Sequence, residues 1–339
     1  MSKETYLEVH DAYIANNFLQ DIPRSKLTAR FTEYLNRVKG VVPSNGIPMA
    51  EFLQWANMMP AKDEEIDSRR MLFTVGIVYT HFIWSFTKAS YVVERDIWKH
   101  LVESDSPKIL PSATLKQLPH WSQWIAAPVT VTHKDSKSDT SYIIDSDGFW
   151  ATYANFNETT HMNLAFVGSI SINNARHIMH MQLIFDITKD MELIDGFDWF
   201  MFILGENGSS HIDPSTPEGP VVARILQEFM KPVVNVLLFI ASEVDNIYKG
   251  GMKRFKPRKQ GNSYKVIPVR DVREWKVGTE LLNEIRTYEN EVETAKSQGR
   301  RAHIRRGHYH NYWYGPRTGD RQLKSRWVPP CVVRGTIED

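Results

Sequence analysis

The chain has 339 residues, of which 42% are hydrophobic and 24% charged, the composition of a globular protein with a sizeable buried core. This excludes collagen-like, low-complexity and disordered classes, and the single cysteine, Cys331, excludes an internal disulfide and a cysteine-based zinc site. The longest apolar run, 233–241, is about half of the ~20 residues that a bilayer crossing needs. The N-terminus does not have the pattern of a signal peptide, so we expect a cytoplasmic protein without a membrane span.

The net charge of +1 is the sum of two unequal parts. Residues 249–334 contain 21 Lys and Arg against 8 Asp and Glu, a net charge of +13, whereas the remainder contains 20 against 32, a net charge of −12. A basic tail on an acidic body predicts either a phosphate-bearing or polyanionic partner for the tail, or a tail that docks on its own body.

The first hundred residues have the three- and four-residue apolar spacing of helices. The spacing runs through Tyr6, Val9 and Tyr13, and then through Leu27, Phe31, Tyr34, Leu35 and Val38. After Gly40 and Pro43 interrupt this pattern, a short helix is predicted over 48–58 and a long one over 63–88. Two prolines in 103–112 predict a linker.

From about residue 125 the apolar period changes to two, which is typical of β-strands. The strand-like runs are 125–131, 141–144, 149–155, 164–172, 180–187 and 199–204. Two of these runs flank the segment from Asp145 to Gly148, whose residue types are typical of a tight hairpin turn. We therefore expect an antiparallel meander that contains a hairpin at this point.

The rest of the chain predicts helices and a final hairpin. A helix is expected over 217–247, with Pro232 as a kink or break. Residues 249–265 are rich in Gly, Lys and Arg and predict an exposed, mobile loop. A helix over 279–294 follows, and the runs 303–314 and 323–333 are expected to pair as a hairpin.

Together these elements predict an α+β fold with four regions. They are an N-terminal helical region (1–110), a central antiparallel β meander with packed helices (111–210), a packed helix (211–248) and a basic C-terminal region that carries a His/Arg/aromatic β-hairpin (249–339).

The segment richest in side chains suited to binding or catalysis is 300–314, RRAHIRRGHYHNYWY. The chain has no Gly-rich phosphate loop, nucleophile elbow or HExxH motif. Alternate side chains of a strand share one face. The two faces would carry Arg306, His308, His310 and Tyr312 on one side, and Arg305, Gly307, Tyr309, Asn311 and Trp313 on the other.

Four interpretations of this segment are open. Its rings and cations can pack in a core or dock on the acidic body, or they can bind RNA through forked Arg–phosphate contacts and base stacking. A histidine pair with a nearby guanidinium can also cleave RNA by general acid–base catalysis. A metal site of His303, His308 and His310 is disfavoured, because no carboxylate lies within the motif. We expect no metal and no cofactor.

Three weaker features each have a structural and a functional interpretation. Histidines in 177–181 are either half-buried core residues or ligands, and the two aspartates of 195–198 are either turn residues or a catalytic pair. The tryptophan pair in 121–124 either anchors the sheet to the helices or lines a ligand pocket. The structural interpretation is favoured in each case.

The tail segment RRAHIRRGHYHNYWYGP, followed by RQLKSRWVPPCVV, resembles the signature end of a type V-A anti-CRISPR family, the second of these families to be named, whose members occur on bacterial phages and plasmids. The segments LPHWSQWI, GFWATYANFN and VVNVLLFIASEVDNIYKG are similar to family segments in the same order. The resemblance covers about residues 115–335. The chain has Tyr309 where the family motif has Trp, and its turn at 315–320 is longer.

The resemblance implies inhibition of the type V-A RNA-guided nuclease by an unusual route. It implies that the protein lowers production of the nuclease during translation, keyed to the emerging N-terminal polypeptide, so that the nuclease mRNA is lost. The implied partners are this nascent polypeptide, the mRNA or the translating ribosome, and host nucleases that cut the message. The implied place of action is the cytoplasm of the bacterial host.

Two functional interpretations follow. In the first, the chain is a recognition module in which a groove of the acidic body reads the peptide while the basic tail faces RNA or the ribosome. Its predicted contact residues are Arg300, Arg301, Arg305, Arg306, Tyr309, Tyr312, Trp313, Arg326 and Trp327. In the second, the chain is a metal-independent ribonuclease whose catalytic candidates are His303, His308 and His310. We favour the first, because the histidine cluster matches no recognisable nuclease pattern.

Overall fold

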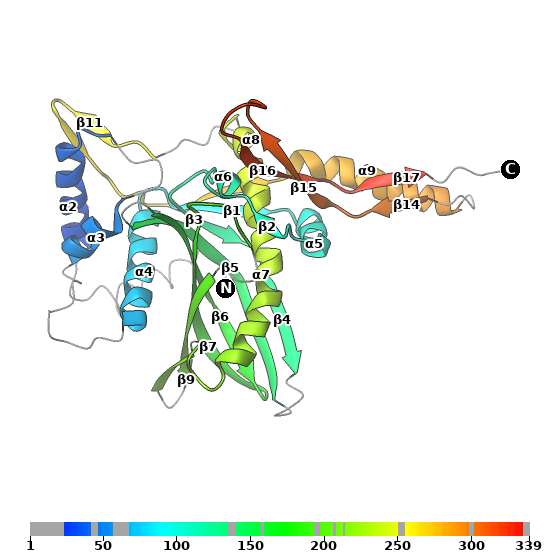
Figure 1. Cartoon of the computed structure of the whole chain (residues 1–339), viewed down its shortest axis with the longest axis horizontal. Helices are drawn as coiled ribbons and strands as arrows, with labels where there is room; N and C mark the ends of the chain where they lie inside the picture. The colour runs from blue at the N-terminus through cyan, green and yellow to red at the C-terminus, as the bar shows by residue number, and fades with distance from the viewer. Residues whose placement is uncertain are drawn as a thin grey trace.

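The computed structural model describes residues 24–41, 47–56, 68–134, 140–156, 159–192, 197–205, 208–212, 214–249, 255–297 and 302–334 (Figure 1). The apolar spacing from Tyr6 to Tyr13 lies outside these ranges. The fold is α+β, as predicted, with N-terminal helices, a central sheet made mainly of antiparallel strands, and a C-terminal hairpin.

The helices are α2 (Arg24–Arg37), α3 (Met49–Ala56), α4 (Ser68–Trp84), α5 (Arg95–Glu103), α6 (Ser112–Leu115), α7 (Gly219–Ser242), α8 (Val244–Lys249) and α9 (Thr279–Ser297). The strands of the main sheet are β1 (Ala89–Val93), β3 (Ser122–Ala126), β4 (Val129–Lys134), β5 (Ser141–Phe156), β6 (Thr159–Ile172), β7 (Ala175–Asp186), β9 (Phe197–Gly205), β10 (Gly208–Ile212) and β13 (Arg273–Val277). Short two-stranded ladders pair β2 (Ile109–Leu110) with β8 (Met191–Glu192), and β11 (Arg258–Gln260) with β12 (Ser263–Lys265).

The main sheet has the strand order β10-β9-β7-β6-β5-β3-β1-β13, with β4 also paired to β5. Its strands from β5 to β10 form the predicted antiparallel meander. β3 and β4 pair with different halves of β5, whereas β1 pairs in parallel with both β3 and β13. Strands from the first and last of the four predicted regions therefore complete the central sheet.

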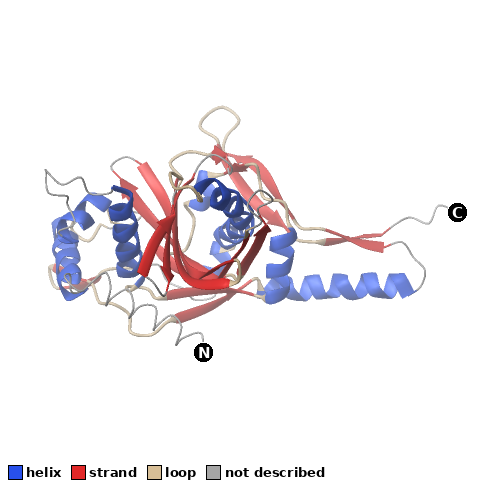
Figure 2. Cartoon of the chain, turned by 90° about the horizontal axis from the view of Figure 1, so that it is seen from below, coloured by secondary structure: helices blue, strands red, loops and turns tan. Residues whose placement is uncertain are grey.

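Helix α7 lies in the concave side of the curved sheet (Figures 1 and 2). Its apolar residues pack against inward-facing side chains of β5, β6 and β7, such as Phe149, Phe166 and Met181. By length and composition α7 could cross a membrane, but 72% of its most apolar window is buried in this fold, as in the core helix of a globular protein. Of the kink or break predicted at Pro232, the break is wrong, because α7 continues through this buried proline and ends at Ser242.

Helix α4 covers the opposite face of the sheet. Trp124 and Trp150 pack with tilted rings whose centroids are 4.3 Å apart, and Trp84 of α4 meets Trp150 edge-on at 5.9 Å. Trp121 packs nearby against Phe255, at 5.3 Å. The tryptophan pair therefore anchors the sheet to the helices, as its structural interpretation predicted.

The predicted hairpin turn at 145–148 is wrong. Strand β5 runs without interruption through these residues and pairs with β6 along its length, with a bulge between Ser146 and Phe149. A Cβ atom at Gly148 would lie 2.3 Å from the carbonyl oxygen of Ile125, so glycine is required here for the close approach of β3. The same residue types favour bulges and turns, and the pattern is consistent with both.

Two further predictions for the N-terminal third need correction. The stretch predicted to be helical contains strand β1, whose pairing partners are far apart in the sequence. The segment 103–112 is not an exposed linker, because Leu110 is 1% exposed and Ser104 is buried. The carbonyl oxygen of Ser104 accepts a hydrogen bond of 2.9 Å from Asn235 Nδ2, which fixes the segment to α7.

The predicted loop at 249–265 contains the β11–β12 hairpin, which docks on α2. The backbone N–H of Tyr264 donates to Asn36 Oδ1 at 2.7 Å, and Asn36 Nδ2 donates to the carbonyl oxygen of Tyr264 at 3.1 Å. Phe255 packs against Phe31 at 6.2 Å between ring centroids. The prediction of exposure is correct for Arg258, whereas residues 250–254 lie outside the described part of the chain.

Gly76 lies where α4 approaches the sheet closely. A Cβ atom at this position would lie 1.8 Å from Nε2 of buried Gln182, which donates a hydrogen bond of 2.7 Å to Asn163 Oδ1. We expect Gly76→Ala to lower the free energy of unfolding by about 1–3 kcal/mol, because Gln182 must move and lose this bond. Urea denaturation of Gly76→Ala in the wild-type and Gln182→Ala backgrounds measures this. A penalty that persists unchanged beside Gln182→Ala would contradict the proposed clash.

Candidate interaction surface on the C-terminal hairpin

The predicted C-terminal hairpin is present, and each of its arms consists of two pieces. β14 (Ala302–Arg305) pairs with β17 (Cys331–Arg334), and β15 (His308–Tyr314) pairs with β16 (Gln322–Val328). Pro329 and Pro330 interrupt one arm, because proline has no N–H to donate to the ladder. On the other arm Gly307 lies so close to the Trp327 ring that a Cβ atom would be 2.7 Å from it.

One face of the β15–β16 ladder, the inner face, packs on the protein body. Trp327 is 3% exposed, meets Phe239 of α7 edge-on at 5.4 Å, and donates from Nε1 to Ser104 Oγ at 3.2 Å. The Tyr309 hydroxyl donates to the carbonyl oxygen of Asn235, and its burial raises the pKa of this phenol well above the usual range. The two residues thus anchor the hairpin to the body.

Asn235 connects three elements from inside α7. Its side-chain Nδ2 donates to the carbonyl oxygens of Leu101 and Ser104, at 2.9 Å each, while its own carbonyl oxygen accepts from Tyr309. The first two acceptors lie at the C-terminal end of α5, where the Leu101 carbonyl oxygen also accepts from the backbone N–H of Ser104, the residue that caps the helix. Asn235 therefore couples α5, α7 and the hairpin.

The opposite face of the same ladder, the outer face, points to solvent. Residues that face each other across an antiparallel ladder share a side. The outer face consists of His308, His310, Tyr312 and Tyr314 from β15, and Gln322, Lys324, Arg326 and Val328 from β16. Lys324 Nζ lies 4.3 Å from the centroid of the Tyr314 ring, a cation–π contact.

The catalytic candidates are only partly brought together. His308 is half-buried and His310 is exposed opposite Arg326, and both lie on the outer face with Tyr312. His303 lies on the other ladder, opposite Val333, and its side chain is outside the described set.

The remaining predicted contact residues have different environments. Arg305 ends β14, and both Arg305 and Arg306 are exposed. Trp313 is 57% exposed, although it shares the inner side of the ladder with Tyr309 and lies opposite buried Leu323. Arg300 and Arg301 lie outside the described residues.

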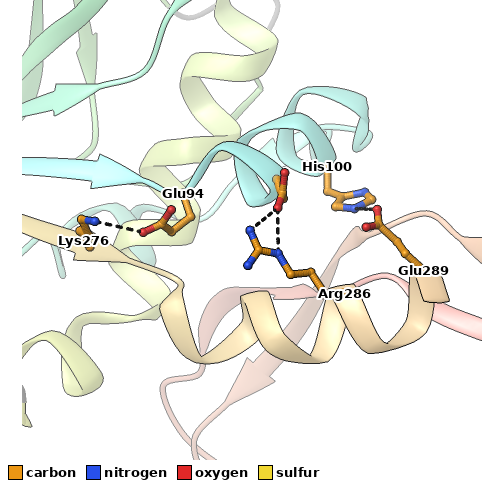
Figure 3. A network of polar contacts seen from close by, with 6 residues as sticks. Glu94, His100, Lys276, Arg286 and Glu289 are labelled. Atoms are coloured by element: carbon orange, nitrogen blue, oxygen red, sulfur yellow. Dashed lines mark hydrogen bonds and ion pairs between the residues drawn. The ribbon is translucent and has the colours of Figure 1, made fainter. Parts of the chain in front are cut away.

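Helix α9 and the β14–β17 ladder form an arm that projects from the body (Figure 2). Polar contacts at its base join α5 and the residue that precedes α5 to β13 and α9 (Figure 3). They are Lys276 Nζ to Glu94 Oε1 (3.9 Å), Arg286 Nε and Nη2 to Asp96 Oδ2 (3.2 and 3.0 Å), and His100 Nε2 to Glu289 Oε1 (3.5 Å). Part of the basic tail therefore docks on the acidic body, although partly exposed pairs of this kind are individually weak.

The histidine-rich run of β7 belongs to the core. His180 is 3% exposed and His177 is half-buried, and the described residues contain no group of three or more His, Cys, Asp or Glu side chains placed to hold a metal ion. Asp198 lies in β9 opposite Ile184, whereas Asp195 is outside the described chain. Burial, and then the nearby His81 of α4, lowers the pKa of His180 to about 4.

The low pKa of His180 makes stability depend on pH. The folded pKa of about 4 lies below the unfolded value of 6.5, so the unfolded state binds more protons between these values and stability falls as the pH falls. We expect this one group to lower the free energy of unfolding by about 2 kcal/mol between pH 7 and pH 5. Urea denaturation at both pH values measures this. His180→Gln should remove that part of the pH dependence and His310→Gln should keep it; equal slopes for all three proteins would contradict the prediction.

A separate groove lies between α2 and α3, with a volume of about 420 Å³. It is lined by Lys26, Arg30, Glu33, Tyr34, Arg37, Glu51, Gln54 and Trp55. Arg37 pairs with Glu51 across it. Sequence reasoning did not single out this groove, because its lining residues have the ordinary composition of exposed helix faces.

Comparison with known proteins places the hairpin in a wider context. The model of the AcrVA2-like anti-CRISPR type V subtype A2 family matches residues 91–335. Protein FinQ of Escherichia coli is 26% identical over 274 residues, which cover 76% of this chain and 75% of FinQ. The crystal structure of AcrVA2 is similar in fold, with a TM-score of 0.52 at 17% identity, over 96% of this chain and 97% of that one. The matched segment runs from β1 through the sheet and α7 to the C-terminal hairpin.

Proposed function

The chain belongs to the anti-CRISPR type V subtype A2 family, and on that premise we propose that it blocks production of the type V-A RNA-guided nuclease by recognising the nascent N-terminal polypeptide of that nuclease. Recognition during translation leads to loss of the nuclease mRNA, with host nucleases doing the cutting in the bacterial cytoplasm. The observation that carries the proposal is the family match over residues 91–335, which supports an anti-CRISPR role in the bacterial cell.

The distribution of charge supports a division of labour within this function. The body outside residues 249–334 carries a net charge of −12, and the C-terminal region carries +13. A basic surface favours contact with the ribosome or the message, because both present phosphate groups. The acidic body would then read the nascent polypeptide.

A reporter assay in a bacterial host tests the peptide signal. The reporter follows the N-terminal coding region of the nuclease in three versions: native, synonymously recoded, and frameshifted so that similar RNA encodes a different peptide. Message and protein are measured with and without this chain. We expect the native and recoded messages to be depleted alike, because they encode the same polypeptide, and the frameshifted message to survive.

The frameshifted reporter is the matched control, since it keeps almost all of the nucleotide sequence. Equal depletion of the recoded and frameshifted messages would reject recognition of the peptide. Depletion of the native message alone would show that the RNA sequence is read instead.

A ribonuclease is the second candidate function, because β15 places His308 and His310 on one face beside Arg326. Two imidazoles near a guanidinium can exchange a proton and stabilise a phosphorane. For a recognition module, we expect His308→Ala and His310→Ala each to leave reporter depletion within about twofold of the parent. Loss of depletion in either variant with RNA binding retained would favour the ribonuclease, since only chemistry would be removed.

A further inference from the structure

We propose that the distal part of the β15–β16 hairpin binds single-stranded RNA without sequence preference. This part of the hairpin, the hairpin platform, presents Tyr312, Tyr314, Lys324 and Arg326 on the outer face of the ladder and Trp313 on the inner face. The proposal is independent of nascent-peptide recognition, because it concerns the purified chain and RNA alone.

Exposed rings are the first observation. Trp313 is 57% exposed, Tyr314 60% and Tyr312 39%, so three consecutive large aromatic side chains meet solvent at one end of a strand. Trp327 on the same ladder is 3% exposed, so exposure is not common to every ring of the hairpin. Clustered exposed apolar side chains mark interaction sites.

The ladder that carries the platform is anchored to the body. Its inner face is fixed to the body by the Trp327 and Tyr309 hydrogen bonds, and the backbone N–H of Ser325 donates to Thr114 Oγ1 at 3.0 Å. A surface that is already ordered loses little conformational entropy when a ligand binds. The rings are therefore presented on a fixed ladder.

Charge identifies the kind of ligand. Residues 305–328 contain six Lys and Arg against a single acidic residue, Asp320. None of these six cations forms an ion pair with another residue that the structure describes. Unpaired cations beside exposed rings match the alternation of phosphates and bases, because phosphate binds the cation while the base stacks on the ring.

The geometry favours a single strand over a duplex or a peptide. Lys324 Nζ lies 4.3 Å from the Tyr314 ring centroid, so a base stacked on the exposed side of this ring would have its phosphate within reach of a cation. In a duplex the base faces are occupied by neighbouring base pairs, and the rings would have nothing to stack on. An acidic peptide would satisfy the cations without using the rings.

Fluorescence anisotropy with the purified full chain tests the platform. The probes are labelled 12-nucleotide oligouridine and oligoadenosine RNA, the matching DNA strands, an RNA duplex of the same length, and a 12-residue polyglutamate. We expect both RNAs to bind. The double variant Trp313→Ala with Tyr314→Ala should weaken binding at least tenfold, because each stacked base is lost. Arg326→Ala should weaken it several-fold and reduce the slope of log K against log salt by about 0.7.

A matched control changes exposed residues of the same kinds elsewhere. Arg176→Ala with Ile178→Ala removes a cation and a 55% exposed apolar side chain from β7, and should leave RNA affinity within twofold. If single-stranded DNA binds as tightly as RNA, the proposal is also supported, because DNA offers the same phosphates and bases to the cations and rings. The proposal is overturned if neither RNA binds, if the ring variant binds within twofold of the parent, or if duplex or polyglutamate binds as tightly as the single strand.

Discussion

Replacing Trp327 by alanine is expected to lower the free energy of unfolding by about 3–5 kcal/mol, the cost typical of removing a fully buried tryptophan. The ring fills the space between Phe239 and Gly307, and its Nε1 donates to Ser104 Oγ, so the change opens a cavity and also leaves a buried hydroxyl without this donor. Guanidinium chloride denaturation followed by circular dichroism measures the loss.

Trp313→Ala is the matched control, since both residues are tryptophans on the same side of the same ladder. Trp313 is 57% exposed, so its loss should change the free energy of unfolding by no more than about 0.5 kcal/mol. Hydrogen exchange of the β16 backbone amides adds a local readout, because a detached hairpin exchanges faster. Similar losses for the two variants, or unchanged β16 protection in Trp327→Ala, would contradict the anchoring role.

The contrast between the two tryptophans shows how far the sequence could predict the candidate site. Strand alternation correctly placed His308, His310 and Tyr312 on one face. It could not tell which face meets the core, because Tyr and Trp rings suit both a core and an exposed interface. That choice depends on α7 and α5, which pack under the ladder and are distant in sequence.

The fold shows the same division between local and non-local information. The period-two runs predicted β5, β6, β7 and β9, because alternation is a local consequence of one buried face. The pairing of β1 with β13 joins residues about 180 positions apart, and no local pattern indicates it. At Gly148 the local signal was ambiguous, and the continuous partner strand β6 decides for a bulge over a turn.

Asn235 is the functional-site residue that sequence reasoning missed. It lies in the apolar run 233–241, where a single amide gives no sign of its partners. Its importance comes from the carbonyl oxygens of Leu101 and Ser104, which are brought to it by the packing of α5 on α7. A single polar residue in an otherwise apolar run is the one available signal, because such a group must find hydrogen-bond partners when it is buried.

Asn235→Asp is expected to lower the free energy of unfolding by about 3–5 kcal/mol at pH 7, because it replaces a donor by an unpaired buried charge. One carboxylate oxygen would face the Leu101 and Ser104 carbonyl oxygens at the negative end of the α5 dipole. The other would take the place of Asn235 Oδ1, which is buried and has no hydrogen-bond partner among the residues that the structure describes. Burial and these acceptors raise the folded pKa of the new carboxyl above its unfolded value of about 3.9.

The sign of the pH dependence separates this charge effect from a simple loss of contacts. A raised folded pKa means that the folded state binds more protons, so the penalty is smallest below about pH 4 and grows by about 1.4 kcal/mol per pH unit until the folded pKa is reached. The measured quantity is the difference in unfolding free energy between variant and parent from pH 4.5 to 7.5. Asn235→Ala loses the same hydrogen bonds without gaining a charge, so its penalty should be flat across this range. A flat profile for Asn235→Asp, or parent-like stability at pH 7, would show that Asn235 does not hold α5 and the hairpin through its amide.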